Sequence, residues 1–488
     1  MSLAGARVAI IQDNAINESM GICDLAGYLG SKGVDTRLFL RREEPELGSE
    51  LRRFGPDMVV VPCDLMGHNS ALQSAREAKQ AVDAPVVLGG THPTFFHNIV
   101  LQPNVDYAFA GESEGVISDL LERRRDGADA TDVQNLIWND GGTPRLNPIR
   151  PFTLDLNAMP MPDREVYFRY DFMASFPAKK FSTGRGCQYS CGYCFNQAYK
   201  SMLESKKTFF RRKSGDRIAE EINAVRAKHP LKIVHFSDDL FASGEGWLHE
   251  FIETYKRRVG LPFSCNVFAT SITDETIRFL KDGGCVSVAM GLELADDTLR
   301  RDIMNKPVTT DEIRHAAALV KKLGIRLVTF NILGVPWSSV DGDLDTLELN
   351  QQLGTDHTRV TVLVPYPVSA VSRKLMQDGY LVEDYEDRIY EIPDIPTWPA
   401  MSVFKRTDPD RTLRLYWLWP LMLKLKFSRK WMKRLVNSNL SWALAPFSFV
   451  ISLVNEKKIF GFTWLDGIRY FLHVKNPAFK TANYVTFI

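Results

Sequence analysis

The sequence predicts an α/β protein with a doubly wound domain first, a partial (β/α)6 barrel second and a mostly helical region last. Short apolar runs alternate with helix-like spacing twice along the chain, over residues 1–125 and again from about residue 180. The alternation stops near residue 378, after which tryptophans and basic residues gather. Strands that alternate with helices are typical of parallel sheets covered by helices.

Length and composition limit the class of protein. A chain of 488 residues divides into several domains, and 60 basic against 59 acidic residues offer no field that would attract nucleic acid. The N-terminus has no export signal, and seven cysteines in such a chain favour metal ligands in a reducing cytoplasm over disulfides. The longest apolar run, 442–454, is broken by Pro446 and is too short to span a membrane.

The first alternation predicts five buried parallel strands and three helices. The strands are 8–11, 36–40, 58–61, 86–88 and 107–110, and the helices are 25–32, 70–82 and 116–125. Ligands of a doubly wound domain bind beyond the carboxyl ends of its strands. Here two of these ends run into glycine-bearing turns, 89–94 and 111–115, which we therefore expect to form the binding edge.

The rest of the chain divides into three parts. Residues 126–164 are rich in Asp, Asn, Gly and Pro and are predicted to be a linker between the first domain, 1–125, and a second domain, 165–377. The six strands expected in the second domain are 180–183, 233–237, 263–269, 286–292, 327–333 and 360–364, with helices such as 218–228, 274–282 and 310–323. Residues 378–488 form the predicted C-terminal domain, which we expect to close the substrate site.

Three cysteines lie together on a glycine-rich loop after the first strand of the second domain. Cys187, Cys191 and Cys194 can supply three thiolates to a four-iron cluster and leave its fourth iron open for a small chelating molecule. Two alternatives are a structural zinc site and three unrelated core cysteines. Zinc usually needs four ligands, and no second Cys/His pair at a suitable spacing is present.

The spacing of these cysteines, with Tyr193 before the third, resembles the radical S-adenosylmethionine (SAM) superfamily. The resemblance covers about residues 180–370. It implies a [4Fe–4S] cluster on Cys187, Cys191 and Cys194, with SAM on the open iron and cleaved to a 5′-deoxyadenosyl radical. It also implies an electron donor such as a flavodoxin or a ferredoxin.

The same resemblance implies SAM-binding residues beyond the cysteine loop. Tyr193 would lie beside the adenine, Ser237 and Asp238 near the amino group, Glu293 at the ribose and Ile332 in the adenine segment. A structural role is open to each as well: Asp238 or its neighbour Asp239 could cap a helix, Glu293 could be a solvated strand end, and Tyr193 could only pack.

Two departures from the family pattern concern the SAM pocket. Trp337 and Ser338 stand where the family often has Gly-Glu, and Phe330 stands where a small residue is expected.

A doubly wound domain before such a core resembles the cobalamin-binding subclass of radical SAM enzymes. The residues that carry the resemblance, and that it implies for cobalamin binding, are Gly89, Gly90, Thr91, His92, Gly111 and Glu112. Glycine turns let backbone N–H groups approach a bulky ligand. No histidine follows the first strand, so we expect no histidine ligand to cobalt from that loop. For His92, a turn histidine that satisfies backbone groups is the alternative.

The leading functional hypothesis is a methyltransferase that transfers a methyl group to an unactivated carbon through a 5′-deoxyadenosyl radical and methylcobalamin. An oxidative cyclase with the same cofactors, or a non-catalytic corrinoid-binding protein, is the alternative. Residues 420–435 interleave basic and apolar side chains, which fits either a helix on a membrane surface or one packed on the barrel. We expect the substrate to be a small or lipid-like molecule and the protein to be located in the cytoplasm. If residues 420–435 form a helix on a membrane surface, the protein would also contact the membrane peripherally.

Overall fold

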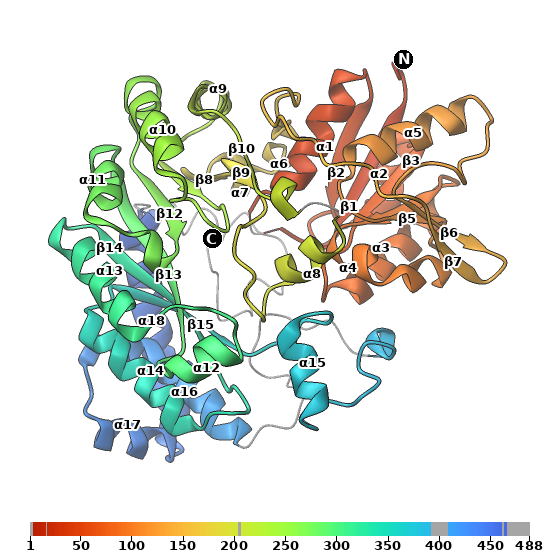
Figure 1. Cartoon of the computed structure of the whole chain (residues 1–488). Coiled ribbons are helices and arrows are strands. Elements are labelled where there is room, and N and C mark those ends of the chain that lie inside the picture. Colours follow the sequence, from red (N-terminus) through yellow and green to blue (C-terminus); the bar gives the residue numbers. More distant parts are fainter. Residues whose placement is uncertain (1–2, 16, 204–205, 392–407, 461–462, 466–488) are drawn as a thin grey trace.

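A computed structural model describes residues 3–15, 17–203, 206–391, 408–460 and 463–465. It contains two large sheets whose domains lie side by side, with C-terminal helices beside the second sheet (Figure 1). The doubly wound domain and the partial barrel predicted from the sequence are both confirmed.

The first sheet has the order β2-β1-β3-β4-β5-β6-β7. Its parallel strands are β1 (Arg7–Gln12), β2 (Asp35–Leu40), β3 (Met58–Pro62), β4 (Val86–Gly89) and β5 (Tyr107–Phe109). Buried residues of α1 (Met20–Ser31) and α5 (Glu114–Arg125) pack on one face. Those of α2 (Leu47–Phe54) and α3 (His68–Ala81) pack on the other. Two short helices, α4 (Thr91–Phe95) and η1 (His97–Leu101), follow β4.

The segment predicted as a linker, 126–164, contains two strands of this sheet. β6 (Leu136–Asp140) and β7 (Thr143–Leu146) form an antiparallel hairpin that pairs with β5. Its turn carries Gly141 and Gly142 at positive φ, a backbone conformation that glycine adopts without strain. The glycines that indicated a linker therefore mark a hairpin turn.

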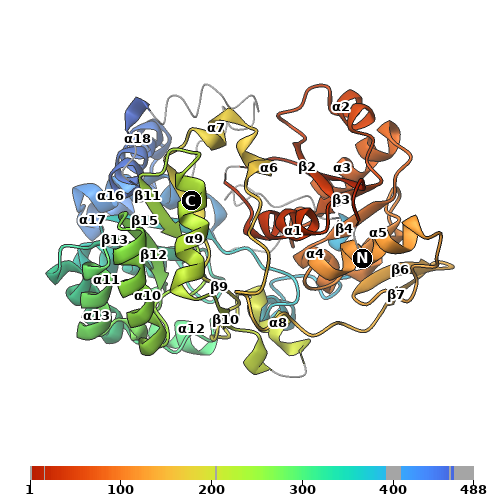
Figure 2. The same ribbon diagram turned by 90° about the horizontal axis from the view of Figure 1, so that it is seen from above.

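The second sheet is an open half-barrel of six parallel strands in the order β15-β14-β13-β12-β11-β8. The strands are β8 (Ala178–Phe181), β11 (Ile233–Phe236), β12 (Phe263–Val267), β13 (Cys285–Glu293), β14 (Arg326–Leu333) and β15 (His357–Val362). The main helices between them are α9 (Gly215–Arg226), α10 (Glu245–Arg258), α11 (Asp274–Asp282), α13 (Thr310–Lys322) and α14 (Val340–Leu353). Seen from above, α11 and α13 lie far from the first domain, whereas α9 lies on the side of the barrel that faces it (Figure 2).

Shorter elements fill the connections of the second domain. They are α6 (Glu165–Phe168), α7 (Asp171–Ala174), β9 (Gly184–Arg185), α8 (Phe195–Ser201), η2 (Lys206–Thr208), β10 (Arg211–Arg212), η3 (Ala269–Ser271), α12 (Asp297–Asp302), α15 (Ala370–Gln377) and η4 (Ile389–Glu391). Strands β9 and β10 pair antiparallel next to the cysteine loop.

The C-terminal region is helical over its described residues, as predicted. The chain forms α16 (Pro409–Leu425), α17 (Arg429–Val436) and α18 (Leu440–Phe460), and α16 and α18 contact strand β15. Residues 420–435 are not one helix, because Lys426 adopts φ +51° and ends α16. In the described part of the chain, no helix has both the length and the apolar character needed to cross a membrane.

Candidate active site at the facing sheet edges

A cavity of about 700 Å³, the interdomain cavity, lies between the two domains. On one side it is lined by the turns after β4 and β5, including Gly89, Gly90, Thr91, Gly111 and Glu112. The barrel side contributes the strand β9 and residues of α8 and α9. The volume lies in the upper part of the range of small-molecule sites, about 300–1,000 Å³.

Two glycines let the backbone form the wall of this cavity. A Cβ atom on Gly89 would lie 1.7 Å from Cζ of Phe109, and one on Gly90 would lie 2.6 Å from the carbonyl oxygen of Cys63. Gly90 also has φ +123°, a conformation that side chains disfavour. The Gly-Gly turn is therefore required by packing, and it presents backbone to the cavity instead of side chains.

His92, which the sequence associated with cobalamin, does not line the interdomain cavity. Its side chain is fully buried, with Nδ1 3.1 Å from the carbonyl oxygen of Leu65 and Nε2 3.3 Å from the hydroxyl of Tyr390. The ring stacks on His68 at 4.9 Å between centroids. The turn at residues 89–94 therefore points its histidine inward, into contacts with the protein itself.

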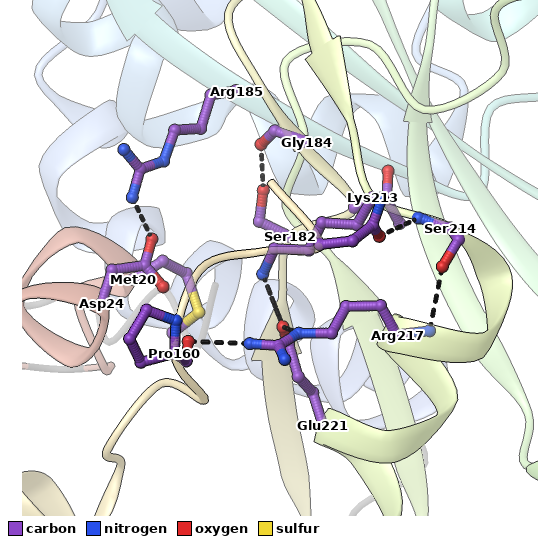
Figure 3. Close-up of polar contacts among 12 residues, drawn as sticks. Met20, Asp24, Pro160, Ser182, Gly184, Arg185, Lys213, Ser214, Arg217 and Glu221 are labelled. Atoms are coloured by element: carbon purple, nitrogen blue, oxygen red, sulfur yellow. Dashed lines mark hydrogen bonds and ion pairs between the residues drawn. The ribbon is translucent and has the colours of Figure 1, made fainter. Parts of the chain in front are cut away.

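Arg185 joins the barrel to the first domain across the interdomain cavity (Figure 3). Its guanidinium pairs with Asp24 of α1 at 2.7 Å, with Glu112 at 2.9 Å and with Glu114 at 2.6 Å. Glu112 also pairs with Arg211 at 2.8 Å. Burial raises the pKa of Glu112, but the two arginines outweigh burial and lower it below its ordinary value. Glu112 is thus an ionised carboxylate at the domain junction.

A second contact, between the segment 126–164 and the barrel, lies nearby in Figure 3. Arg217 of α9 donates to the carbonyl of Pro160 at 2.7 Å and pairs with Glu221 at 3.0 Å. Lys213 pairs with the same Glu221 at 2.8 Å. The segment before α6 is therefore attached to the barrel by a buried, charge-assisted network.

The three predicted cluster ligands line a second cavity of about 370 Å³, the cysteine cavity. Cys187, Cys191 and Cys194 are free thiols on the loop between β9 and α8. Burial raises the pKa of each thiol, that of Cys194 to about 12. Thiolates in this cavity therefore need a cationic partner, and iron bound by the thiolates would supply that charge.

Backbone hydrogen bonds fix the cysteine loop against the barrel. Gly192 N–H donates to the carbonyl of Met304 at 2.7 Å, and the carbonyl of Gly192 accepts from Val371 N–H at 2.9 Å. Asn305 Nδ2 donates to the carbonyl of Ser190 at 2.6 Å. These bonds attach the cysteine loop to the segments at residues 304–305 and 371.

Tyr193, Glu293 and Ile332 all line the cysteine cavity, as contact with SAM would require. Glu293 accepts from the hydroxyl of Tyr193 at 2.8 Å and from Lys306 Nζ at 2.7 Å, with the lysine and the glutamate both buried. A Cβ on Gly291 would lie 2.2 Å from Lys306 Nζ, so a side chain at this position would displace the lysine from its present place. Burial, and next Glu293, raise the pKa of Tyr193 well above its ordinary value, which keeps its hydroxyl protonated.

Ser237 and Asp238, predicted to contact SAM, line neither cavity. The Asp238 carboxylate accepts from Thr183 N–H at 3.0 Å and from the Thr183 hydroxyl at 2.8 Å. Asp239 faces inward instead: it lines both cavities and accepts from Asn196 Nδ2 at 2.7 Å. The side chain that reaches the cavities after β11 is therefore that of Asp239, and not those of Ser237 or Asp238.

Two kinds of site residue escaped the sequence analysis. Asn196, which lines both cavities, and Arg359, which lines the cysteine cavity, have no local motif that would mark them. The partners of Arg185 lie 71 to 161 residues away in the chain. The sequence offers one signal for Arg185, its place between two glycines just before the cysteine motif. That position does not identify the carboxylates with which Arg185 pairs.

Two family models match the chain. Residues 7–121 match the B12 binding domain and residues 181–349 match the radical SAM superfamily. The chain is a B12-binding radical SAM protein. Together the two models cover more than half of the sequence, and such domains take cobalamin, a [4Fe–4S] cluster and SAM as cofactors. In this radical SAM protein, the two matched regions border the two cavities described above.

Several known proteins are similar to this radical SAM protein. An uncharacterised methyltransferase of Pyrococcus horikoshii is 23% identical over 327 residues, covering 66% of this chain and 70% of the relative. The cytidylyl-2-hydroxyethylphosphonate methyltransferase of Streptomyces wedmorensis is 19% identical and covers 75% of each chain.

Solved structures share the fold. The cobalamin-dependent SAM radical enzyme OxsB superposes with a TM-score of 0.63 at 15% identity, covering 99% of this chain and 71% of that one. The radical SAM methyltransferase TsrM of Kitasatospora setae superposes with a TM-score of 0.62 at 14% identity, covering 77% and 76%.

Proposed function

We propose that this protein is a cobalamin-dependent methyltransferase that methylates an unactivated carbon of a small or lipid-like molecule. The observation that carries the proposal is that the interdomain cavity and the cysteine cavity are neighbours with a shared wall. Asn196 and Asp239 line both, which supports a substrate held between a group bound in one cavity and a group bound in the other. Two of the relatives named above are methyltransferases, which supports the same class.

The residues that would hold the cofactors follow from these cavities. Cys187, Cys191 and Cys194 would ligate the cluster. Tyr193, Glu293 and Ile332 would contact SAM, and Asp239 would take the role predicted for Ser237 and Asp238. The backbone of the turns at residues 89–91 and 111–112 would lie along cobalamin. A flavodoxin or ferredoxin would supply the electron.

Methylation of an unactivated carbon requires a radical mechanism. The carbon has no acidic proton and no nucleophilic character, so a radical has to be made first. When bound, the cluster and SAM supply a 5′-deoxyadenosyl radical, and cobalamin supplies the methyl group. The residues of this protein orient the substrate between the two cavities and exclude water. The protonated Tyr193 and the Lys306–Glu293 pair present fixed hydrogen-bonding groups on one wall.

The test is an anaerobic turnover of enzyme loaded with cluster and cobalamin, using methyl-labelled SAM and fractionated cell extract. S-adenosylhomocysteine and 5′-deoxyadenosine in near-equal amounts, with label in an extract component, are the expected result. The Cys191→Ala variant should lose both products, while Cys285→Ala, a change in a buried core cysteine, should retain them. Substrate-dependent 5′-deoxyadenosine without S-adenosylhomocysteine or transferred label would overturn the proposal and favour an oxidative cyclase.

A further inference from the structure

The C-terminal helices expose large apolar side chains that most of the protein buries. Leu425 is 55% exposed and Trp431 is also 55% exposed. On one face of α18, Trp442, Phe447 and Val450 are exposed as well. Most of the exposed large apolar residues in the described part of the chain belong to this region. Such a concentration is typical of an interaction surface.

The basic residues from 424 to 434 fall into two groups. Arg429 and Lys433 attach α17 to α14, because Arg429 pairs with Asp345 at 2.6 Å and Lys433 pairs with Asp341 at 2.9 Å. The others point to solvent: Lys424, Lys426, Lys430 and Arg434 are exposed. No acidic residue occurs from 424 to 434. The charges of Arg429 and Lys433 are therefore neutralised by carboxylates of α14, whereas the exposed basic residues give the solvent-facing side of the segment a net positive charge.

Helix α17 combines the exposed charges with an exposed indole. Met432, Leu435 and Val436 are buried against the protein, while Lys430, Trp431 and Arg434 face outward. The guanidinium of Arg434 lies 5.3 Å from the centroid of the Trp431 ring. The apolar face of α17 is thus already packed on the protein, and the indole of Trp431 lies on the opposite, solvent-facing side between two cations. Tryptophan and basic side chains in this arrangement are typical of the boundary between lipid headgroups and acyl chains.

We propose that Lys424, Leu425, Lys426, Lys430, Trp431 and Arg434, the basic aromatic edge, dock the protein on the surface of an anionic lipid bilayer. Phosphate headgroups are complementary to the four exposed cations, and Leu425 and Trp431 would enter the interfacial layer. The proposed contact is peripheral and involves only the headgroup and interfacial layers of the bilayer. The proposal does not depend on the reaction that the protein catalyses.

Flotation of the full chain with vesicles tests the proposal. The vesicles are phosphatidylcholine alone, or phosphatidylcholine with phosphatidylglycerol at a 3:1 ratio. Binding should require the anionic lipid and weaken at high salt, since the screening length falls from roughly 10 Å at 0.1 M to 3 Å at 1 M. The triple variant Lys424→Gln/Lys426→Gln/Lys430→Gln should lose affinity on the order of 100-fold, at roughly fivefold for each basic residue near the surface.

Matched controls separate this edge from general charge and folding effects. Arg124→Gln/Lys232→Gln/Lys281→Gln removes three exposed cations elsewhere and should bind as the unchanged protein does. Trp431→Ala should weaken binding, whereas Leu154→Ala, at a 63% exposed side chain outside this region, should not. Circular dichroism verifies that each variant is folded.

Three results would overturn the proposal. The first is no flotation of the unchanged protein with anionic vesicles at low salt. The second is an equal loss in both triple variants. The third is a dimer in light scattering that the triple variant abolishes without any vesicle binding, which would assign the edge to a second copy of the chain.

Discussion

Replacing Arg185 by methionine should weaken the attachment of the two domains, because one guanidinium serves three carboxylates. The side chain of Arg185 is 22% exposed, and those of Asp24, Glu112 and Glu114 are 15%, 17% and 10% exposed. Removing one partner of a buried ion pair costs about 3–5 kcal/mol. Arg211 still pairs with Glu112, and the site is partly hydrated, so we expect a loss of about 2–3 kcal/mol.

The assay is urea unfolding followed by tryptophan fluorescence at a series of pH values. With a slope of about 3 kcal/mol per molar urea, the midpoint of the transition should fall by about 1 M. Arg150→Met is the matched control. Arg150 pairs with the 42% exposed Asp119, a contact of the kind worth about 0–1 kcal/mol.

The pH series tests whether the loss of stability comes from the ion pairs of Glu112. The pKa of Glu112 is lowered from its ordinary value of 4.5, so its ion pairs stabilise the fold above about that pH and lose this effect as the pH falls through the lower folded value. Loss of Arg185 removes part of that stabilisation. The gap between the two proteins should therefore be widest at neutral pH and narrow below about pH 4. A gap independent of pH, or one matched by Arg150→Met, would refute the reasoning.

Three further predictions concern the cofactor cavities. Cys191→Ala should lower the iron content of the reconstituted protein and its absorbance near 400 nm, whereas Cys285→Ala, at a buried core position, should leave both unchanged. Glu293→Gln should weaken SAM binding by about 10- to 100-fold, the value of about one hydrogen bond to a charged group, as measured by equilibrium dialysis. Gly89→Ala should lower the cobalamin content, because its Cβ would overlap the Phe109 ring, and Phe109→Leu in the same chain should restore part of it.

The local rules of strand and helix patterning were sufficient to predict both sheets. The strands at 8–11, 58–61 and 86–88 are continuous apolar runs, as expected where helices cover both faces of a parallel sheet. The cysteine loop was also predictable, because its spacing is set by one cluster and depends on nothing distant in the sequence. The hairpin of β6 and β7 was missed, since its glycines also suit a linker.

The direction of individual side chains could not be predicted with the same rules. Adjacent residues at a strand end face opposite ways, so Asp239 reaches the cavities while Asp238 holds Thr183. His92 turns inward because the contacts with Leu65 and Tyr390 come from distant parts of the chain. Such choices depend on tertiary partners, which a single sequence does not reveal.

The contact of α16 and α18 with β15 has a consequence for solubility. The half-barrel does not close, and β15 is the last strand of its sheet, so among the described residues no further strand pairs with the backbone groups of its outer edge. An open edge of this kind is a template for pairing with other chains. The helices beside it act as a shield against intermolecular strand addition. A chain shortened before α16 should therefore self-associate through β15, even though both cofactor-binding domains are complete.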